Sequence, residues 1–319
     1  MIHSTKKPLI VVGAGNWGKN LVRNFNQLGA LAGVAEAHPN LRAEVTSTYP
    51  NIDIYTDFEQ ALETNVQALV LATPAPTHYK LAMAALRAGK DVFVEKPITL
   101  RTEEARTLAE YADKHERVLM VGHLLLYQPA IAWMRDYLAS GKAGKVLRVS
   151  TQRLKLGKVR KEENVWWSFA PHDVSVILDL LGNPQLQKAK ALGSAILQPG
   201  IEDYVQVEMC FQNGQSAQIS CSWYHPLTQR STVVIAEKQM LVYDEVLQTV
   251  TIHDKFIDQD LQHFDKGIEV VEVAASEPLK IECQHFLDCL KTRQKPRSDG
   301  WNGVAVVEIL EEAQKSLHG

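Results

Sequence analysis

The sequence predicts an α/β protein with an N-terminal Rossmann domain, in which a doubly wound parallel sheet is covered by helices. A second α/β domain is expected to be built on an open, mostly antiparallel sheet. Up to residue 125, short apolar runs alternate with helical patterns, which implies right-handed crossovers between parallel strands. After residue 200, strands with alternating apolar and polar residues follow one another. We therefore expect a dinucleotide-binding domain over residues 1–125 and a substrate-binding and oligomerisation domain over 126–319, with the terminal helices packing back on the first.

A glycine-rich turn stands between the first predicted strand and the first predicted helix. Gly13 permits a tight turn, Gly15 lets the backbone approach a pyrophosphate, and Gly18 allows the helix to pack close to the strand. The helix that follows presents its N-terminal amides to phosphate groups. The predicted cofactor-binding turn comprises Gly13, Gly15, Asn16, Trp17 and Gly18. A purely structural glycine turn is the alternative.

An acidic residue, Glu36, ends the next predicted strand. A carboxylate at this place accepts hydrogen bonds from the ribose hydroxyls of a dinucleotide and repels a 2′-phosphate. We therefore expect NAD rather than NADP as the cofactor. The alternative is a solvated glutamate.

Composition and charge exclude several classes of protein. The formal net charge is −3 and no long basic run occurs, which argues against a nucleic-acid partner. No apolar run has the roughly 18–20 residues of a membrane span, and the N-terminus lacks the apolar core of a signal peptide. No His or Cys cluster has metal-ligand spacing, so no metal is expected. The cysteines, without C-x-x-C spacing, are expected to be reduced packing residues of a cytoplasmic protein: Cys210, Cys221, Cys283 and Cys289.

Candidate ligand-binding residues follow the predicted parallel strands, because ligands on such sheets bind beyond the carboxyl ends of the strands. Besides the glycine turn and Glu36, the cofactor-binding candidates at this edge are Thr73, Pro74, His78, Glu95, Lys96 and His123. His78 has an alternative role at the start of a helix, and His123 an alternative role in core packing.

Lys96 and His172 are the candidates for catalysis. Lys96 follows a buried strand, where its ammonium group can hydrogen-bond a substrate hydroxyl and stabilise the alkoxide. His172 follows Pro171, and proline favours the first turn of a helix. In that turn the helix dipole favours a neutral imidazole, which can accept a hydroxyl proton. The alternatives are a solvent-facing lysine and a histidine that caps or packs a helix start.

A charged segment precedes this helix, and several of its residues are candidates for substrate binding. Arg160 or Lys158 would meet an anionic substrate and Asn164 would fix its hydroxyl groups, unless the segment is merely a solvated face. Core packing is the alternative for Tyr127. The full set of substrate-binding candidates is Lys96, Tyr127, Arg160, Asn164, Trp167, His172 and Asp173.

The second half contains a hairpin signal, Asn213-Gly214, between two alternating strands. One face of the resulting sheet is apolar and the other is semi-polar. Sheets of this kind often pair with another subunit, so we expect a homo-oligomer, a dimer or tetramer, formed through the C-terminal sheet.

Three segments carry a resemblance to the glucose–fructose oxidoreductase/inositol dehydrogenase/MocA (Gfo/Idh/MocA) family. They are Ala72–His78, Gly89–Pro97 with its Glu-Lys-Pro motif, and Ser168–Leu181. The resemblance covers nearly the whole chain. It implies a Rossmann domain with a bound nicotinamide cofactor and a C-terminal α/β domain through which members usually oligomerise. By position, Lys96 is the family lysine and His172 the family histidine.

One departure from the family pattern bears on the substrate. Many polyol-oxidising members have an aspartate four residues before the histidine, where this chain has Ser168. Residues 160–173 are more similar to the branch that oxidises the C3 hydroxyl of UDP-N-acetylglucosaminuronic acid with NAD, in nucleotide-sugar biosynthesis for bacterial surface polysaccharide. The resemblance thus implies a UDP-linked sugar acid as the substrate. A free sugar or polyol, or a non-catalytic NAD-binding regulatory protein, are the alternatives.

Overall fold

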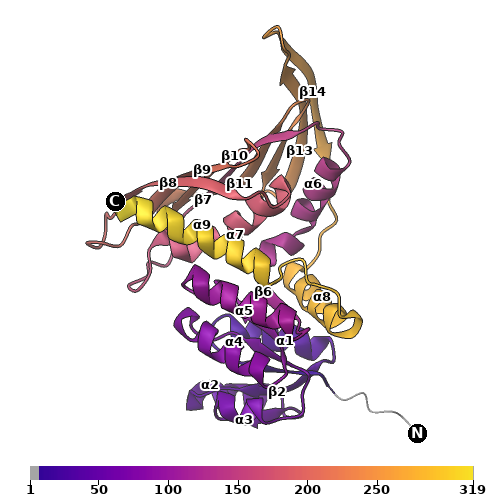
Figure 1. Ribbon diagram of the computed structural model, residues 1–319, viewed down its shortest axis with the longest axis vertical. Coiled ribbons are helices and arrows are strands. Elements are labelled where there is room, and N and C mark those ends of the chain that lie inside the picture. The colour runs from indigo at the N-terminus through magenta and orange to yellow at the C-terminus, as the bar shows by residue number, and fades with distance from the viewer. Residues whose placement is uncertain (1–6, 319) are drawn as a thin grey trace. The chain divides into compact units, whose positions relative to one another are not determined.

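The computed structural model describes residues 7–318, which form two compact units (Figure 1). The first unit contains residues 7–123 and Glu277–Val307, and the second contains Leu124–Ser276 and the remainder of the chain from Glu308. The sequence boundary at 125 lies two residues from this division. Residues 277–307 belong to the first unit, which agrees with the expectation that terminal helices pack back on the first domain.

The first unit contains a six-stranded parallel sheet in the order β3-β2-β1-β4-β5-β6. Its strands are β1 (Leu9–Val12), β2 (Leu31–Ala35), β3 (Asp53–Tyr55), β4 (Ala68–Leu71), β5 (Asp91–Glu95) and β6 (Leu119–Gly122). Strands β1, β4, β5 and β6 are buried throughout, as expected for a sheet covered on both faces. The strand order reverses between β1 and β4, and the crevice at their carboxyl ends is where such sheets bind dinucleotides. The predicted Rossmann sheet is confirmed.

Helices cover both faces of this sheet (Figure 1). They are α1 (Gly18–Gln27), α2 (Pro39–Thr48), α3 (Phe58–Leu62), α4 (His78–Arg87), α5 (Thr102–Lys114) and α8 (Pro278–Thr292), with the 3-10 turn η1 (Ala75–Thr77) before α4. Helix α8 packs on α1 although about 250 residues separate them in the sequence. Phe286 of α8 lies edge-on to Phe93 and Phe25, with ring centroids 5.6 and 6.4 Å apart.

The second unit is built on an eight-stranded open sheet in the order β14-β13-β12-β11-β7-β10-β9-β8. Its strands are β7 (Val146–Leu156), β8 (Leu186–Ser194), β9 (Tyr204–Phe211), β10 (Ser216–Ser222), β11 (Tyr224–Ala236), β12 (Met240–Asp244), β13 (Thr249–Ile257) and β14 (His263–Val271). Strands β7 and β10 are parallel, and the other neighbours listed in that order are antiparallel. The mostly antiparallel sheet is confirmed. So is the β9–β10 hairpin, where Gly214 adopts a φ of +84°.

Helix α7 (Val165–Leu181) packs on β7, β9 and β10, and α6 (Pro129–Ala139) packs on β12. The 3-10 turn η2 (Leu124–Tyr127) precedes α6, and α9 (Gly300–His318) ends the described chain. The buried face of the sheet carries Val149, Ile219 and Val234. No helix of the described residues is both long and apolar enough to cross a bilayer.

Three of the cysteines are buried, as predicted for packing residues: Cys221, Cys283 and Cys289. Cys210 is exposed instead, which corrects the prediction for that residue. It alternates along β9 with the buried Met209 and Phe211, so its side chain points to the opposite face of the sheet.

Candidate functional site

The glycine turn after β1 has the geometry of a phosphate-binding turn. Gly13 has a φ of +91°, and a Cβ there would lie 2.9 Å from the Ala72 carbonyl oxygen. A Cβ on Gly18 would lie 2.1 Å from the Gly13 carbonyl oxygen, so α1 can start this close to the turn only with glycine. A Cβ on Gly15 would meet no atom within 4 Å. Gly15 thus faces open space, where the backbone is free to approach a pyrophosphate.

Glu36 lies directly beside this turn. Its Oε2 accepts a hydrogen bond from the Ala14 amide at 2.6 Å, and its Oε1 accepts one from the His38 amide at 2.8 Å. These bonds fix a buried carboxylate at the end of β2, next to the turn. This is the arrangement that recognises the ribose hydroxyls of NAD, so the residues present fit the cofactor.

The end of β5 forms a second part of the same edge. Trp17 Nε1 donates a 2.5 Å hydrogen bond to Glu95 Oε1, and the Lys96 amide donates one of 3.2 Å to Glu95 Oε2. Burial raises the pKa of Glu95 to about 7, although the Trp17 hydrogen bond and the Lys96 charge oppose this. A Cβ at Gly122 would lie 3.0 Å from the Glu95 carboxyl group. The ends of β5 and β6 are thus packed tightly around this acid.

His123 follows β6 and is fully buried. Neither of its ring nitrogens has a hydrogen-bond partner among the described residues. Burial and the nearby positive charge of Lys96 lower its pKa to about 3, so the ring is neutral at physiological pH. Buried polar groups are normally satisfied. An unsatisfied imidazole at this edge therefore fits a site that is completed by a bound molecule.

His78 has a structural role beside these residues, and its role as a cofactor ligand stays a prediction. Its ring bridges the carbonyl oxygens of Pro97 and Thr73, each at 2.8 Å, and is almost completely buried. Burial lowers its pKa against the opposing effect of the two carbonyl acceptors. His78 thereby connects the loops after β4 and β5. On the first of these loops Thr73 is partly exposed and Pro74 is exposed.

Helix α7 begins earlier than predicted, which corrects the place of His172. Asn164 is its N-cap and accepts a hydrogen bond from the Trp167 amide at 3.2 Å. Pro171 is therefore the seventh residue of the helix and His172 the eighth. The buried Val165 and Trp166 hold the additional N-terminal turn in the core. The helix-dipole argument for a neutral His172 consequently does not apply.

Asn164 hydrogen-bonds within the protein, and its role as a substrate ligand stays a prediction. Besides capping α7, its amide nitrogen donates to Glu202 at 2.7 Å and to Gln314 at 3.0 Å. Trp167 Nε1 donates to the same Gln314 at 3.2 Å. These contacts attach the start of α7 to neighbouring elements of the second unit.

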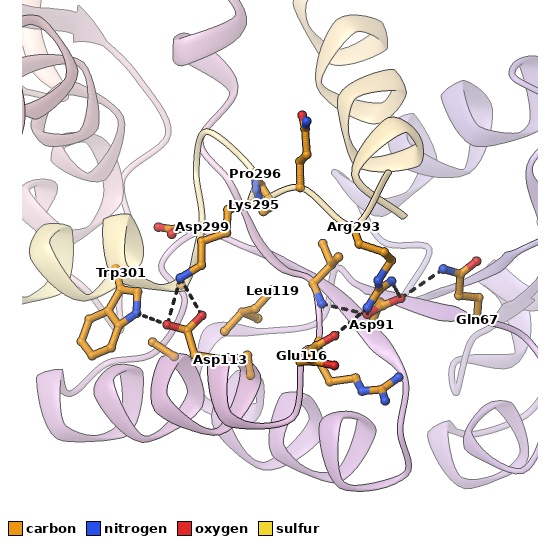
Figure 2. A pocket seen from close by; sticks show the side chains of 16 residues that line it. Gln67, Asp91, Asp113, Glu116, Leu119, Arg293, Lys295, Pro296, Asp299 and Trp301 are labelled. Atoms are coloured by element: carbon orange, nitrogen blue, oxygen red, sulfur yellow. Dashed lines mark hydrogen bonds and ion pairs between the residues drawn. The ribbon is translucent and has the colours of Figure 1, made fainter. Parts of the chain in front are cut away.

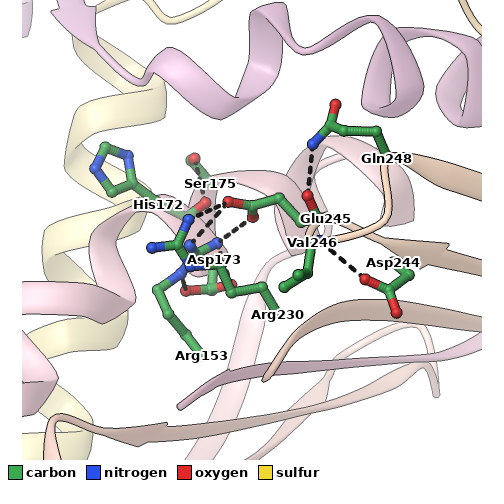
Figure 3. Close-up of polar contacts among 9 residues, drawn as sticks. All are labelled: Arg153, His172, Asp173, Ser175, Arg230, Asp244, Glu245, Val246 and Gln248. Carbon is green, nitrogen blue, oxygen red and sulfur yellow. Dashed lines mark hydrogen bonds and ion pairs between the residues drawn. The ribbon is translucent and has the colours of Figure 1, made fainter. Parts of the chain in front are cut away.

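Asp173 is buried and belongs to an ion-pair network, and its role in substrate binding stays a prediction (Figure 3). Arg153 of β7 donates to both of its carboxylate oxygens, at 2.6 and 3.2 Å. Arg153 also donates to Glu245 at 3.1 Å, and Arg230 of β11 donates to Glu245 at 3.0 Å. The sequence analysis missed Arg153, Arg230 and Glu245, because nothing local distinguishes them from other strand and turn residues.

The last two substrate candidates lie in contrasting environments. Tyr127 is buried in η2. Arg160 is exposed, its Nε lies 3.8 Å from Glu163, and its carbonyl oxygen accepts from Gln198. Exposure of Arg160 leaves it able to meet a ligand, as does its neighbour Lys158.

A cavity of about 700 Å³ lies at the amino ends of the parallel strands, away from the carboxyl ends described above (Figure 2). It is lined by the starts of β5 and β6 and by the link between α8 and α9. Asp91 there binds Arg293 through two hydrogen bonds of 2.6 and 2.9 Å, and Asp113 accepts from Lys295 and Trp301 at 2.9 and 2.8 Å. None of the predicted site residues lines it. Its charged groups attach the α8–α9 link to the sheet.

Comparison with known families matches both halves of the chain. The model described as "Oxidoreductase family, NAD-binding Rossmann fold" matches residues 8–123, and the "GFO/IDH/MocA C-terminal domain" model matches residues 131–242. The chain belongs to the Gfo/Idh/MocA family. The resemblance found in the sequence is thus confirmed. The first unit of this Gfo/Idh/MocA protein is an NAD-binding Rossmann domain, and the protein is an oxidoreductase.

Several relatives are similar to this family member over most of its length. The UDP-N-acetylglucosamine 3-dehydrogenase of Acidithiobacillus ferrooxidans is 26% identical, with 93% of each chain covered. The scyllo-inositol 2-dehydrogenase (NAD(+)) of Bacillus subtilis is 23% identical, covering 80% of this chain and 77% of the relative. A solved structure of the Acidithiobacillus enzyme matches with a TM-score of 0.86 at 25% identity over 97% of both chains. A levoglucosan dehydrogenase in complex with NADH and levoglucosan matches with a TM-score of 0.85 at 17% identity, over 98% of this chain and 97% of that one, and so shares the fold.

Proposed function

We propose that this protein oxidises a sugar hydroxyl with NAD, namely the C3 hydroxyl of a UDP-linked N-acetyl-hexuronic acid. The observation that carries the proposal is the position of Lys96, which follows β5 at the edge of the sheet that holds the glycine turn and Glu36. The relative from Acidithiobacillus, named a UDP-N-acetylglucosamine 3-dehydrogenase, supports a nucleotide-linked sugar and the C3 position. The similarity of residues 160–173 to the uronic-acid branch supports the acid.

In this proposal Lys96 and His172 handle the hydroxyl proton. The C–H bond at the alcohol carbon breaks with its electron pair, the O–H bond breaks, and the hydroxyl proton passes to one of these side chains as the carbonyl forms. When bound, NAD supplies the two-electron acceptor. The positive charge of Lys96 stabilises the developing alkoxide, and Glu36 orients the adenine ribose.

Substitution of the two side chains tests these roles. We expect Lys96→Met and His172→Asn each to lower kcat by about 10²-fold or more, because general acid–base catalysis contributes about 10²–10⁴-fold. NAD affinity, measured by calorimetry, should fall far less than turnover. Lys161→Gln on the exposed loop is the matched control. Near-normal turnover by both variants would contradict the assignment.

Substrate panels separate the proposal from its alternatives. NADH absorbance is followed with UDP-N-acetylglucosaminuronic acid, UDP-N-acetylglucosamine, free sugars and inositols. Turnover confined to free sugars or polyols would favour a dehydrogenase of a free sugar or polyol. The name of the Bacillus relative indicates that class. Tight NAD binding without any turnover would favour a regulatory protein.

We place the activity in the cytoplasm, in nucleotide-sugar biosynthesis for surface polysaccharide, because UDP-sugars are made in the cytoplasm.

We also propose that the second unit forms a homo-oligomer through the open face of its sheet. Strand register places Ile268 and Val270 on the same face as Val233 and Ile235, opposite the buried Val234. Ile268 and Val270 are 57% and 65% exposed. Contiguous exposed apolar groups mark interaction surfaces. Light scattering should give two or four times the 35.7 kDa chain mass, and a monomer would contradict the proposal.

A further inference from the structure

Three basic side chains lie on one face of the sheet in the second unit. Arg153 and Lys155 are two residues apart on β7, so their side chains point to the same face. Arg230 of β11 is directly opposite Arg153 in the register and shares that face. This is the face that packs on α7: Arg153 binds Asp173, and the Lys155 ammonium group lies 5.3 Å from the centre of the Phe169 ring.

The acids on this face do not balance the bases. Asp173 and Glu245 account for the ion pairs of Arg153 and Arg230, whereas Lys155 has no carboxylate within 4 Å among the described residues. One positive charge therefore remains uncompensated. The Nε of Arg230 is also buried without a hydrogen-bond partner in the described part of the chain. Burial, together with the charges of Arg230, Arg153 and Arg160, lowers the pKa of Lys155, which reflects the positive potential at this place.

The two outer bases are accessible while the inner one is not. The Arg230 side chain is 33% exposed and Lys155 is also partly exposed, whereas the Arg153 side chain is 12% exposed. Arg153 is therefore committed to the ion-pair network. Lys155 and Arg230 form the solvent-facing end of the three basic side chains (Figure 3 shows Arg153 and Arg230). Phe169 beneath Lys155 is one helical turn before His172 on α7.

We propose that Lys155 and Arg230 form an anion subsite that receives the negatively charged group of the substrate. This inference rests on the proposed function and specifies which part of that substrate the second unit recognises. An anion here would compensate the excess charge and accept hydrogen bonds from an ammonium and a guanidinium group, which are the strong kind. The anion is a carboxylate on the sugar or the diphosphate that links sugar and nucleoside, since both present the same charged oxygens.

Lys155→Gln tests the subsite without disturbing the network, because Lys155 makes none of its ion pairs. Affinities for UDP-N-acetylglucosaminuronic acid, UDP-N-acetylglucosamine and UDP are measured by calorimetry, and KM is measured for the two sugars. If the subsite binds the carboxylate, Lys155→Gln weakens binding of the acid by roughly 10-fold or more and leaves the other two ligands unchanged. If it binds the diphosphate, all three ligands weaken alike. Lys155→Arg should restore the affinity.

Two results would overturn the proposal, and they are distinguishable. If the wild-type protein turns over a UDP-sugar but Lys155→Gln binds all three ligands normally, the subsite is wrong and the proposed function stands. If the wild-type protein neither binds nor oxidises any UDP-sugar, the proposed function fails and the subsite fails with it. Lys161→Gln, which alters an exposed lysine of the neighbouring loop, controls for a general loss of positive charge.

Discussion

Two clusters of titratable groups differ in how far their members are paired. Glu95, His123 and Glu282 form the first cluster, in the first unit, and Arg153, Asp173 and Glu245 form the second cluster, in the second unit. In the first unit, Glu95 and His123 are buried with few partners, and their pKa values shift towards the neutral form. Glu282 of α8 is fully buried behind them, with no hydrogen-bond partner for either oxygen among the described residues, and burial and the charge of Glu95 raise its pKa. In the second unit, Asp173 is buried and the side chains of Arg153 and Glu245 are 12% and 14% exposed, but these three groups satisfy one another.

This difference is typical of a ligand-binding region on the one hand and a structural support on the other. Unsatisfied buried groups destabilise a fold and cluster at functional sites, and those of the first unit lie at the cofactor edge. Arg153, Asp173 and Glu245, by contrast, direct their charged groups at one another. The Arg153 network instead attaches α7, and with it His172, to the sheet.

Removing the central cation of the second cluster should have the largest effect. Arg153→Met leaves Asp173 and Glu245 buried without their shared partner, so we expect a loss of about 3–5 kcal/mol in the free energy of unfolding. Urea denaturation measures it. The double variant Arg153→Met/Asp173→Leu removes both charges of the closest pair and should recover part of this loss. Equal stability of wild type and Arg153→Met would show that the network is not a support.

Replacing the Glu95 carboxylate by a neutral group should instead raise the free energy of unfolding. Because the pKa of Glu95 is raised from 4.5 to about 7, the folded state binds this proton more tightly than the unfolded state. The contribution to stability is complete below pH 4.5 and is lost as the pH rises through 7. Glu95→Gln should therefore stabilise the protein by up to about 3 kcal/mol at pH 8 and hardly at all at pH 4.

Thermal unfolding across this pH range measures the effect of Glu95→Gln. Turnover should fall in the same variant, because Lys96 loses its charged neighbour. A variant that is less stable than wild type at pH 8 would mean that the Glu95 carboxylate is paired in the folded protein, as Asp173 and Glu245 are.

The smallest effect is expected at Asn164, and it distinguishes the structural role from the predicted one. Asn164→Ala removes the N-cap of α7, so we expect a loss of about 1–2 kcal/mol in the free energy of unfolding. KM for the sugar should be unchanged. Asn164→Ser keeps a capping oxygen and should be less damaging. A raised KM with normal stability would instead support contact with substrate hydroxyls.

Local signals in the sequence were sufficient to predict the parallel sheet of the first unit and the glycine turn after its first strand. Gly13, Gly18 and Glu36 act through turns and strand ends that lie near them in the chain, so their geometry follows from local rules. The position of the Glu-Lys-Pro motif at Glu95 also follows from a local signal, because a buried strand immediately precedes the motif.

Residues whose role depends on distant partners could not be predicted in this way. Arg153 meets Asp173 and Glu245 only because β7, α7 and β12 come together in the fold. The start of α7 was misplaced because Pro171 is a good first-turn residue, while the stronger signal was Asn164 followed by buried apolar residues. A proline removes one backbone donor from a helix, and a helix as buried as α7 tolerates it.

The return of residues 277–307 to the first unit limits how this protein can be divided. The Val121 amide donates to the Ser298 carbonyl at 2.7 Å, and Phe286 covers Phe93 and Phe25. A fragment that stops at residue 123 would leave a sheet edge unpaired and an aromatic cluster exposed to water. Chimaeras that exchange substrate specificity should therefore replace residues 124–276 together with the segment from Glu308, and should retain residues 277–307 from the parent of the first unit.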